Sequence, residues 1–130
     1  MSRAVATAKK QAGAHWEDFA CAHLQRAGLA LLARNFNCRH GELDLVMRDR
    51  DVVVFVEVRY RAEGPAGRYG GGVDSVGPRK CAKLARAASA FLAAHPTLAR
   101  CACRFDVVAI GDGDAAAPTL EWIRNAFEPA

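Results

Sequence analysis

At 130 residues, with 52% hydrophobic and 25% charged positions, the chain has the length and composition of one ordinary globular domain. No apolar run approaches the length of a membrane span, and the N-terminus lacks the continuous apolar segment of a secretion signal. We therefore expect a cytoplasmic protein without a membrane partner. The odd number of cysteines, five, argues against a closed disulfide framework, and the net charge of +4 suggests an anionic partner.

The N-terminal residues 1–12 are mostly small or polar and include three cations. They predict a flexible basic arm ahead of a domain that spans residues 13–128. A first helix is expected from about Ala14 to Ala27, because apolar residues recur there at helical spacing and Gly28 favours an end. Glu17 lies at the border of the apolar stripe. The sequence leaves open whether its side chain follows the edge of the helix or points at the sheet.

A first strand is expected over residues 29–36, followed by a hairpin over residues 43–61. Its strands are rich in β-branched residues and are separated by a polar turn. A turn centred on Arg50 and Asp51 places Asp44 directly opposite Glu57 in an antiparallel ladder. Two facing carboxylates repel each other, so a divalent cation between them is a reasonable expectation.

A surface ion cluster is the alternative interpretation of these charges. Arg59 points to the same face as Glu57, two residues earlier, and the hairpin register places Glu42 opposite Arg59. Glu42 and Arg59 would then form an exposed ion pair of small energetic consequence.

A glycine-rich loop over residues 64–72 lacks phosphate-loop spacing, and a second helix begins at Pro78. Its apolar stripe predicts a core-facing side, whereas cations and Ala87 occupy the other side. No acid occurs between Lys80 and Arg100, which favours nucleic-acid binding over a merely solvated face. The predicted nucleic-acid-binding residues are Arg61, Arg68, Arg79, Lys80, Lys83 and Arg86.

A further strand is expected over residues 104–110, a turn over 111–114, and a last strand or short helix over 120–124. The cysteines and His40 offer a weaker alternative site. Cys38 and His40, like Cys101 and Cys103, are separated by one residue, whereas structural zinc ligands are usually separated by two to four.

The combination of Glu17, Asp44, Glu57 and Arg59 resembles the metal-dependent PD-(D/E)xK nuclease superfamily. More narrowly, the chain is similar to the bacterial YraN family of uncharacterised proteins, which are related to archaeal Holliday-junction resolvases. This resemblance implies an α/β, single-domain, restriction-endonuclease-like core with a mixed β-sheet flanked by helices. It is carried by ARNF at 33–36, GELDL at 41–45, VFVEV at 54–58, PRK at 78–80 and RFDVVAI at 104–110.

The resemblance also implies a catalytic site. Asp44, Glu57 and Glu17 would hold Mg²⁺ or Mn²⁺, and Arg59 would stand where the superfamily has a lysine. Arginine stays protonated, so Arg59 cannot act as a general base, although it can bind a phosphate oxygen. Trp16 replaces the glycine that usually precedes the helical glutamate and would crowd the metal.

Three functions follow as alternatives. The first is a metal-dependent endonuclease that acts on DNA, including branched DNA, for which a homodimer would suit two symmetric cuts. The second is a non-catalytic nucleic-acid-binding module on the same fold. The third is a protein-interaction domain whose cations serve only solubility.

Overall fold

The computed structural model describes residues 3–61, 77–111 and 118–128, with side chains from residue 13 onward. Arg68, the predicted loop over 64–72 and most of the predicted turn over 111–114 lie outside the described residues. The elements are α1 (Arg3–Arg26), β1 (Ala30–Cys38), β2 (Gly41–Asp49), β3 (Val52–Arg61), α2 (Pro78–Ala94), the 3₁₀ helix η2 (Pro96–Leu98), β4 (Ala102–Gly111) and β5 (Thr119–Phe127).

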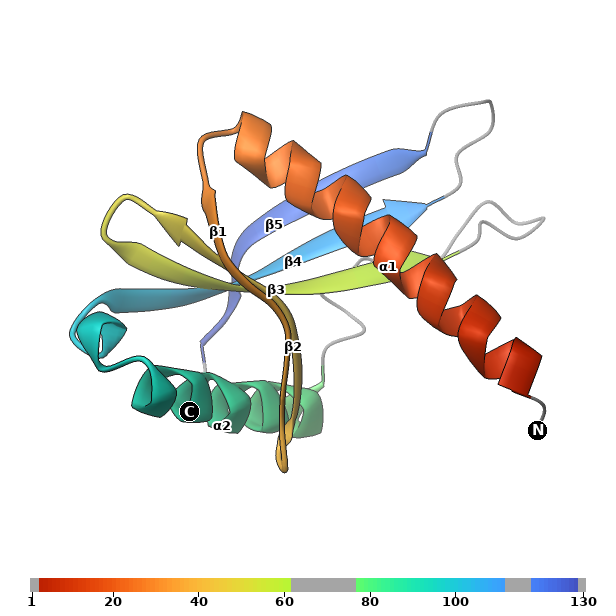
Figure 1. Ribbon diagram of the computed structural model, residues 1–130. Coiled ribbons are helices and arrows are strands. Elements are labelled where there is room, and N and C mark those ends of the chain that lie inside the picture. Colours follow the sequence, from red (N-terminus) through yellow and green to blue (C-terminus); the bar gives the residue numbers. More distant parts are fainter. Residues whose placement is uncertain (1–2, 62–76, 112–117, 129–130) are drawn as a thin grey trace.

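The five strands form one mixed sheet in the order β1-β2-β3-β4-β5. β3 and β4 are parallel, and the other neighbouring pairs are antiparallel. Parallel neighbours need a crossover connection, which contains α2 here. Figure 1 shows α1 on one face of the sheet and α2 on the other. The predicted α/β class, with a mixed sheet flanked by helices, is confirmed.

The sheet separates two hydrophobic clusters. Val54 and Val56 pack in the cluster under α1, whereas Val53 and Phe55 pack in the cluster that contains the apolar face of α2. Because successive side chains of β3 point to opposite faces of the sheet, this strand contributes residues to both clusters. A central strand covered on both faces needs the nearly continuous apolar run that this segment has.

The first helix is longer than predicted. α1 begins at Arg3 rather than near Ala14, so residues 3–12 continue the helix instead of forming an arm. This segment has no proline and contains several alanines, two lysines and a glutamine, all of which favour helix. The predicted end is confirmed, because Gly28 has a left-handed φ of 104° and its N–H donates to the Gln25 carbonyl at 3.0 Å.

The second helix begins at Pro78 as predicted, but the prediction for Ala87 is wrong. Ala87 is only 1% exposed and belongs to the buried face with Leu84 and Phe91. Spacings of three and four residues join these positions, so the buried face is wider than the predicted stripe.

The final element is a strand: β5 pairs antiparallel with β4. Its position depends on Asp106, which is fully buried and was not singled out in the sequence. The Asp106 carboxylate accepts hydrogen bonds from Trp122 Nε1, the Asn125 N–H and Arg104 Nε, at 2.9, 2.9 and 3.0 Å. In the described part of the chain, neither helix is long and apolar enough to cross a membrane.

Candidate metal centre and nucleic-acid interface

The site begins where β2 and β3 stop pairing. The ladder runs from Asp49 opposite Val52 to Leu45 opposite Val56, which confirms the predicted turn and register over these residues. Asp44 lies one position beyond the last recorded pair. Its Oδ2 accepts a 2.9 Å hydrogen bond from the Val58 N–H.

The backbone of β2 is irregular at Asp44. Leu43 packs in the cluster on the α2 side, whereas Leu45 packs in the cluster on the α1 side. Residues two positions apart share a face in a regular strand, so β2 must twist between them. Asp44 and Glu57 were predicted to face each other in the ladder, but the pairing of β2 and β3 ends at Leu45 and Val56. The carboxylates of Asp44 and Glu57 remain close enough to interact electrostatically.

Three carboxylates form an acidic cluster, which consists of Glu17, Glu42 and Asp44. One oxygen from each lies within 4.8 Å of the others. Glu17 points toward the sheet, which decides between the two orientations that the sequence left open. The sequence predicts Glu42 only as a partner of Arg59. The signal that could have identified Glu42 as a member of the cluster is its position two residues before Asp44.

Asn35 holds two members of the acidic cluster together. Its Nδ2 donates to Glu17 Oε1 and to Glu42 Oε1, each at 2.9 Å. The register of β1 and β2 places Asn35 opposite Asp44, and its φ is 51°. Asparagine tolerates this left-handed conformation better than most residues do. On the outer side, an Arg34 guanidinium nitrogen lies 3.7 Å from Glu17 Oε1.

The pKa of Asp44 is raised from 3.8 to about 7. Burial is the largest cause and the charge of Glu57 the second, and Glu17 and Glu42 add to the effect. The hydrogen bond from Val58 acts in the opposite direction, because it stabilises the ionised form. Burial and the neighbouring carboxylates thus favour the protonated form of Asp44, whereas a bound cation would favour its ionised form.

Glu57 lies beside Asp44 but outside the acidic cluster. It is 8% exposed, and its Oε2 lies 3.8 Å from Arg59 Nε and 3.3 Å from Lys80 Nζ. Of the three predicted metal ligands, Glu17 and Asp44 come together with Glu42, while Glu57 is accompanied by two cations. Lys80 comes from α2, so only the tertiary structure reveals its contact with Glu57.

The acidic cluster suits a hard divalent cation. Carboxylate oxygens are the preferred ligands of Mg²⁺ and Mn²⁺, and the mutual repulsion of these three would be relieved by such an ion. The four soft ligands considered for zinc form no comparable group among the described residues; they are Cys38, His40, Cys101 and Cys103.

The side chain of Trp16 lies against the end of β3. Its ring stacks on Tyr60 with centroids 4.4 Å apart and an interplanar angle of 11°, and it packs against the core under α1. Trp16, which was predicted to crowd the metal, therefore occupies space toward the end of β3.

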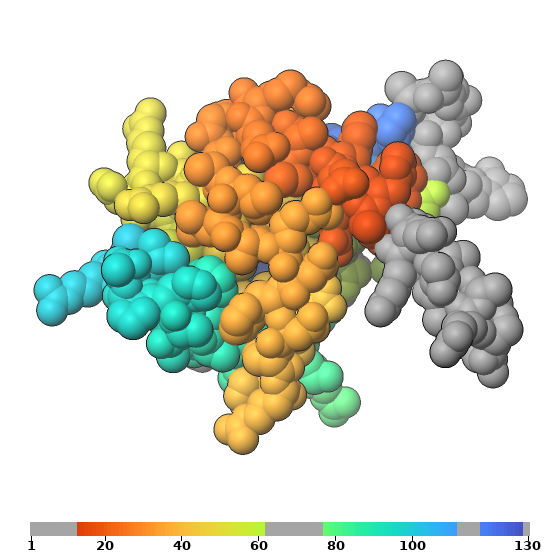
Figure 2. Space-filling view, in the orientation of Figure 1, coloured from red at the N-terminus to blue at the C-terminus, as the bar shows by residue number. Residues whose placement is uncertain are grey.

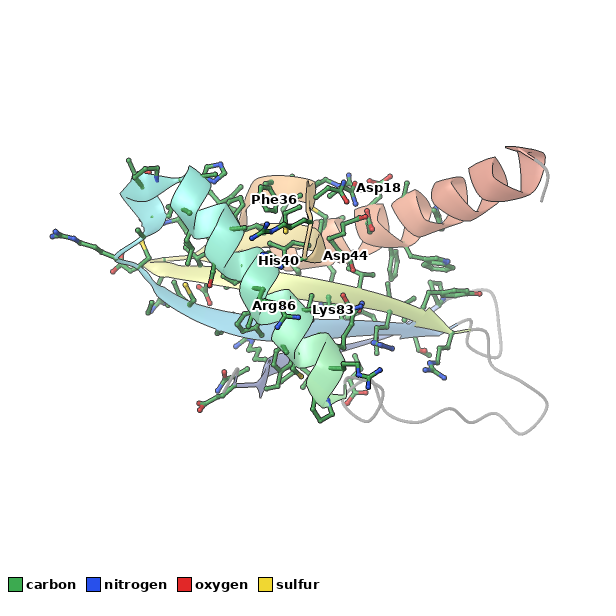
Figure 3. All side chains as sticks on the ribbon, turned by 90° about the horizontal axis from the view of Figure 1, so that it is seen from below. Asp18, Phe36, His40, Asp44, Lys83 and Arg86 are labelled. Carbon is green, nitrogen blue, oxygen red and sulfur yellow. The ribbon has the colours of Figure 1, made fainter. Side chains whose placement is uncertain are left out.

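The predicted basic residues on α2 are exposed. Figure 3 shows Lys83 and Arg86 on this helix, with His40 on the neighbouring β1–β2 turn. In Figure 2, α2 (cyan to green) lies beside the β1–β2 hairpin (orange). A shallow groove of about 380 Å³ lies between them and is lined by His40, Ala85, Arg86, Ser89 and Ala90.

Arg61, another predicted DNA contact, and a second hollow lie outside this groove. Arg61 is exposed at the end of β3. A larger hollow of about 590 Å³ lies at the β2–β3 turn, the opposite end of these strands from Asp44, between Arg124 and residues 49–52. Size alone does not identify the site, because this hollow is remote from the acidic cluster.

Comparisons with known proteins confirm the predicted family of uncharacterised bacterial proteins. The model of a family described as "Uncharacterised protein family UPF0102" matches residues 16–110. A UPF0102 protein of Xanthomonas campestris pv. campestris (strain B100) is 55% identical over 120 residues, which cover 92% of this chain and 93% of that protein. A UPF0102 protein of Stutzerimonas stutzeri (strain A1501) is 53% identical over 119 residues, with 92% and 96% covered.

Proposed function

The chain belongs to the uncharacterised protein family UPF0102, and we propose that it is a metal-dependent endonuclease that binds DNA, including branched DNA, and hydrolyses phosphodiester bonds. One observation carries the proposal: the acidic cluster and Glu57 lie together at the split between β2 and β3, with cations of β3 and α2 beside Glu57. Phosphodiester hydrolysis needs both a hard metal site and positive charge at the phosphate.

Glu17, Glu42 and Asp44 would hold Mg²⁺ or Mn²⁺, with Glu57 as an adjacent carboxylate. The bound ion would supply Lewis-acid polarisation of a water molecule and of the phosphate. Asn35 keeps Glu17 and Glu42 at a short separation. The Val58 N–H fixes one oxygen of Asp44, which leaves its other oxygen available to a ligand.

Cations on the chain would bind the DNA backbone. Lys83 and Arg86 are exposed on α2, and Arg86 lines the groove beside the β1–β2 turn. Lysine and arginine side chains bind phosphate without reading sequence, so we expect recognition of backbone geometry rather than of particular bases.

A cleavage assay tests the proposal. Purified protein is incubated with supercoiled plasmid and with a synthetic four-way junction, in Mg²⁺ and in Mn²⁺. We expect nicking or resolution by the wild type and by Asp51→Ala, an exposed acid at the remote β2–β3 turn, but not by Asp44→Ala. Absence of cleavage by the wild type in both metals would overturn the enzymatic proposal.

A non-catalytic nucleic-acid-binding module is the second candidate, and Arg59 favours it. An arginine beside Glu57 cannot accept a proton at neutral pH. Arg59→Lys separates the two candidates in the same assay. Cleavage by this variant alone would indicate a cleavage site silenced by one substitution, whereas binding without cleavage by every variant would support the module.

A further inference from the structure

Two cations share one oxygen of Glu57, but they differ in distance and exposure. Lys80 Nζ lies 3.3 Å from Glu57 Oε2 and Arg59 Nε lies 3.8 Å from it. The side chain of Lys80 is 44% exposed, against 20% for Arg59. An incoming phosphate can therefore reach the Lys80 ammonium more readily, while Arg59 lies deeper against the sheet.

The location of Lys80 is unfavourable for the helix itself. It lies in the first turn of α2, next to Arg79, and this turn contains no acid. The N-terminus of a helix carries a partial positive charge, so cations in the first turn destabilise the helix. Within the described residues, Gly77 provides no side-chain cap to offset this charge. Helix stability thus gives no reason for Lys80, whereas a role at Glu57 does.

We propose that Lys80 is the cation that contacts the scissile phosphate in the cleavage reaction, while Arg59 holds Glu57 in place. This inference rests on the proposed function. In hydrolysis, the water oxygen forms a bond to phosphorus, and the bond from phosphorus to the leaving sugar oxygen breaks with its electron pair. The leaving oxygen takes up a proton from solvent, and the attacking water releases one to solvent. Lys80 takes no part in these proton transfers and stabilises the negative charge on the phosphate oxygens.

The variant Lys80→Gln tests this role, with Arg100→Gln as its control. Arg100 is an exposed cation between η2 and β4, outside the proposed site and the proposed DNA contacts, and the described residues form no ion pair with it. Rates are measured as single turnovers at saturating DNA, so that weaker binding does not lower them. We expect Lys80→Gln to slow cleavage by about 100-fold or more, and Arg100→Gln to leave the rate unchanged.

Two further measurements exclude a purely structural effect. DNA affinity in EDTA, followed by fluorescence anisotropy, should be similar for Lys80→Gln and Lys83→Gln, because each loses one phosphate contact. In Lys80→Ala, added ethylammonium should restore cleavage in a concentration-dependent manner, since the truncated side chain leaves space for it at an exposed position.

The outcomes separate this inference from the proposed function. Wild-type cleavage with an unchanged saturated rate in Lys80→Gln would overturn the role of Lys80 and leave the nuclease intact. The same holds if Arg59→Gln alone abolishes the rate, or if ethylammonium restores nothing to a folded Lys80→Ala. A wild type that never cleaves would overturn the proposed function, and the role of Lys80 with it.

Discussion

The backbone N–H of Val58 donates a 2.9 Å hydrogen bond to Oδ2 of Asp44, so a side chain of β2 takes the position that a carbonyl occupies in a regular ladder. The bond satisfies an amide of β3 just beyond the point where the recorded pairing ends. It also holds Asp44 at the split between the strands, beside Glu57 and within the acidic cluster. Several measurable properties should depend on this arrangement.

Stability should fall as pH rises, because the pKa of Asp44 is raised from 3.8 to about 7 in the folded state. Between these values the folded protein binds more protons than the unfolded chain, so the contribution of Asp44 is largest below pH 4 and is lost as pH rises through 7. The shift corresponds to at most about 4 kcal/mol, and we expect about 1–3 because Asp44 is partly exposed.

Urea unfolding of wild type and Asp44→Asn at pH 5 and pH 8 measures this effect. Asparagine retains an oxygen for the Val58 N–H but has no charge to desolvate. The variant should therefore gain stability relative to wild type at pH 8. The exposed Asp51→Asn serves as control, and equal pH profiles for wild type and Asp44→Asn would contradict the raised pKa.

Divalent metal should stabilise the protein through the acidic cluster. At a free Mn²⁺ concentration of about 100 times Kd, the gain in the free energy of unfolding is about 2.7 kcal/mol. The gain should be larger at pH 8 than at pH 5.5, because ionised Asp44 is the form that binds a cation. Thermal unfolding with Mn²⁺, and after addition of EDTA, measures both effects.

Glu42→Gln tests membership of the cluster, and the exposed Glu121→Gln on β5 is its control. We expect the metal-dependent rise in Tm to shrink in Glu42→Gln and to persist in Glu121→Gln. If the metal-dependent rise in Tm is undiminished in Glu42→Gln, Glu42 is not a metal ligand, and Glu57 becomes the candidate in its place.

Asn35 should act as a positioning residue for the metal ligands. Asn35→Gly retains the left-handed φ of 51° but removes the amide that joins Glu17 and Glu42. We expect Mn²⁺ affinity to fall by about 10-fold, as is common when groups that orient metal ligands are lost. Isothermal titration calorimetry measures the affinity, and Asn125→Gly, at an exposed position of β5 with a similar φ of 50°, should leave it unchanged.

Lys83 and Arg86 should set the salt dependence of DNA binding. The logarithm of the binding constant falls linearly with the logarithm of salt concentration, with a slope of about −0.9 for each neutralised phosphate of B-DNA. Each variant, Lys83→Gln or Arg86→Gln, should reduce the magnitude of the slope by about 0.9. Arg100→Gln, between η2 and β4, is the control. Equal slopes in all four proteins would remove Lys83 and Arg86 from the DNA contacts. An absence of DNA binding even at low salt would favour a protein-interaction domain with cations that serve only solubility.

The sequence by itself determined the local architecture. The spacing of apolar residues located α2, and Gly28 marked the end of α1. The polar turn at Arg50 and Asp51 determined the register of β2 and β3 as far as Leu45 and Val56. These features depend on residues that are close together in the chain and on the fixed periods of helix and strand. Both can be recognised directly in the sequence. The family relationship was likewise visible in short motifs.

Only the tertiary structure decided the composition of the site. The irregularity at Asp44 moved its carboxylate off the predicted rung, and Asn35 joined α1 to β2 through two glutamates. Lys80, predicted only as a DNA contact, came to lie beside Glu57. These contacts join residues far apart in the chain, and they depend on how α1 and α2 pack on opposite faces of the sheet. Periodicity gives the face on which a residue lies, but not which residue of another element it meets there.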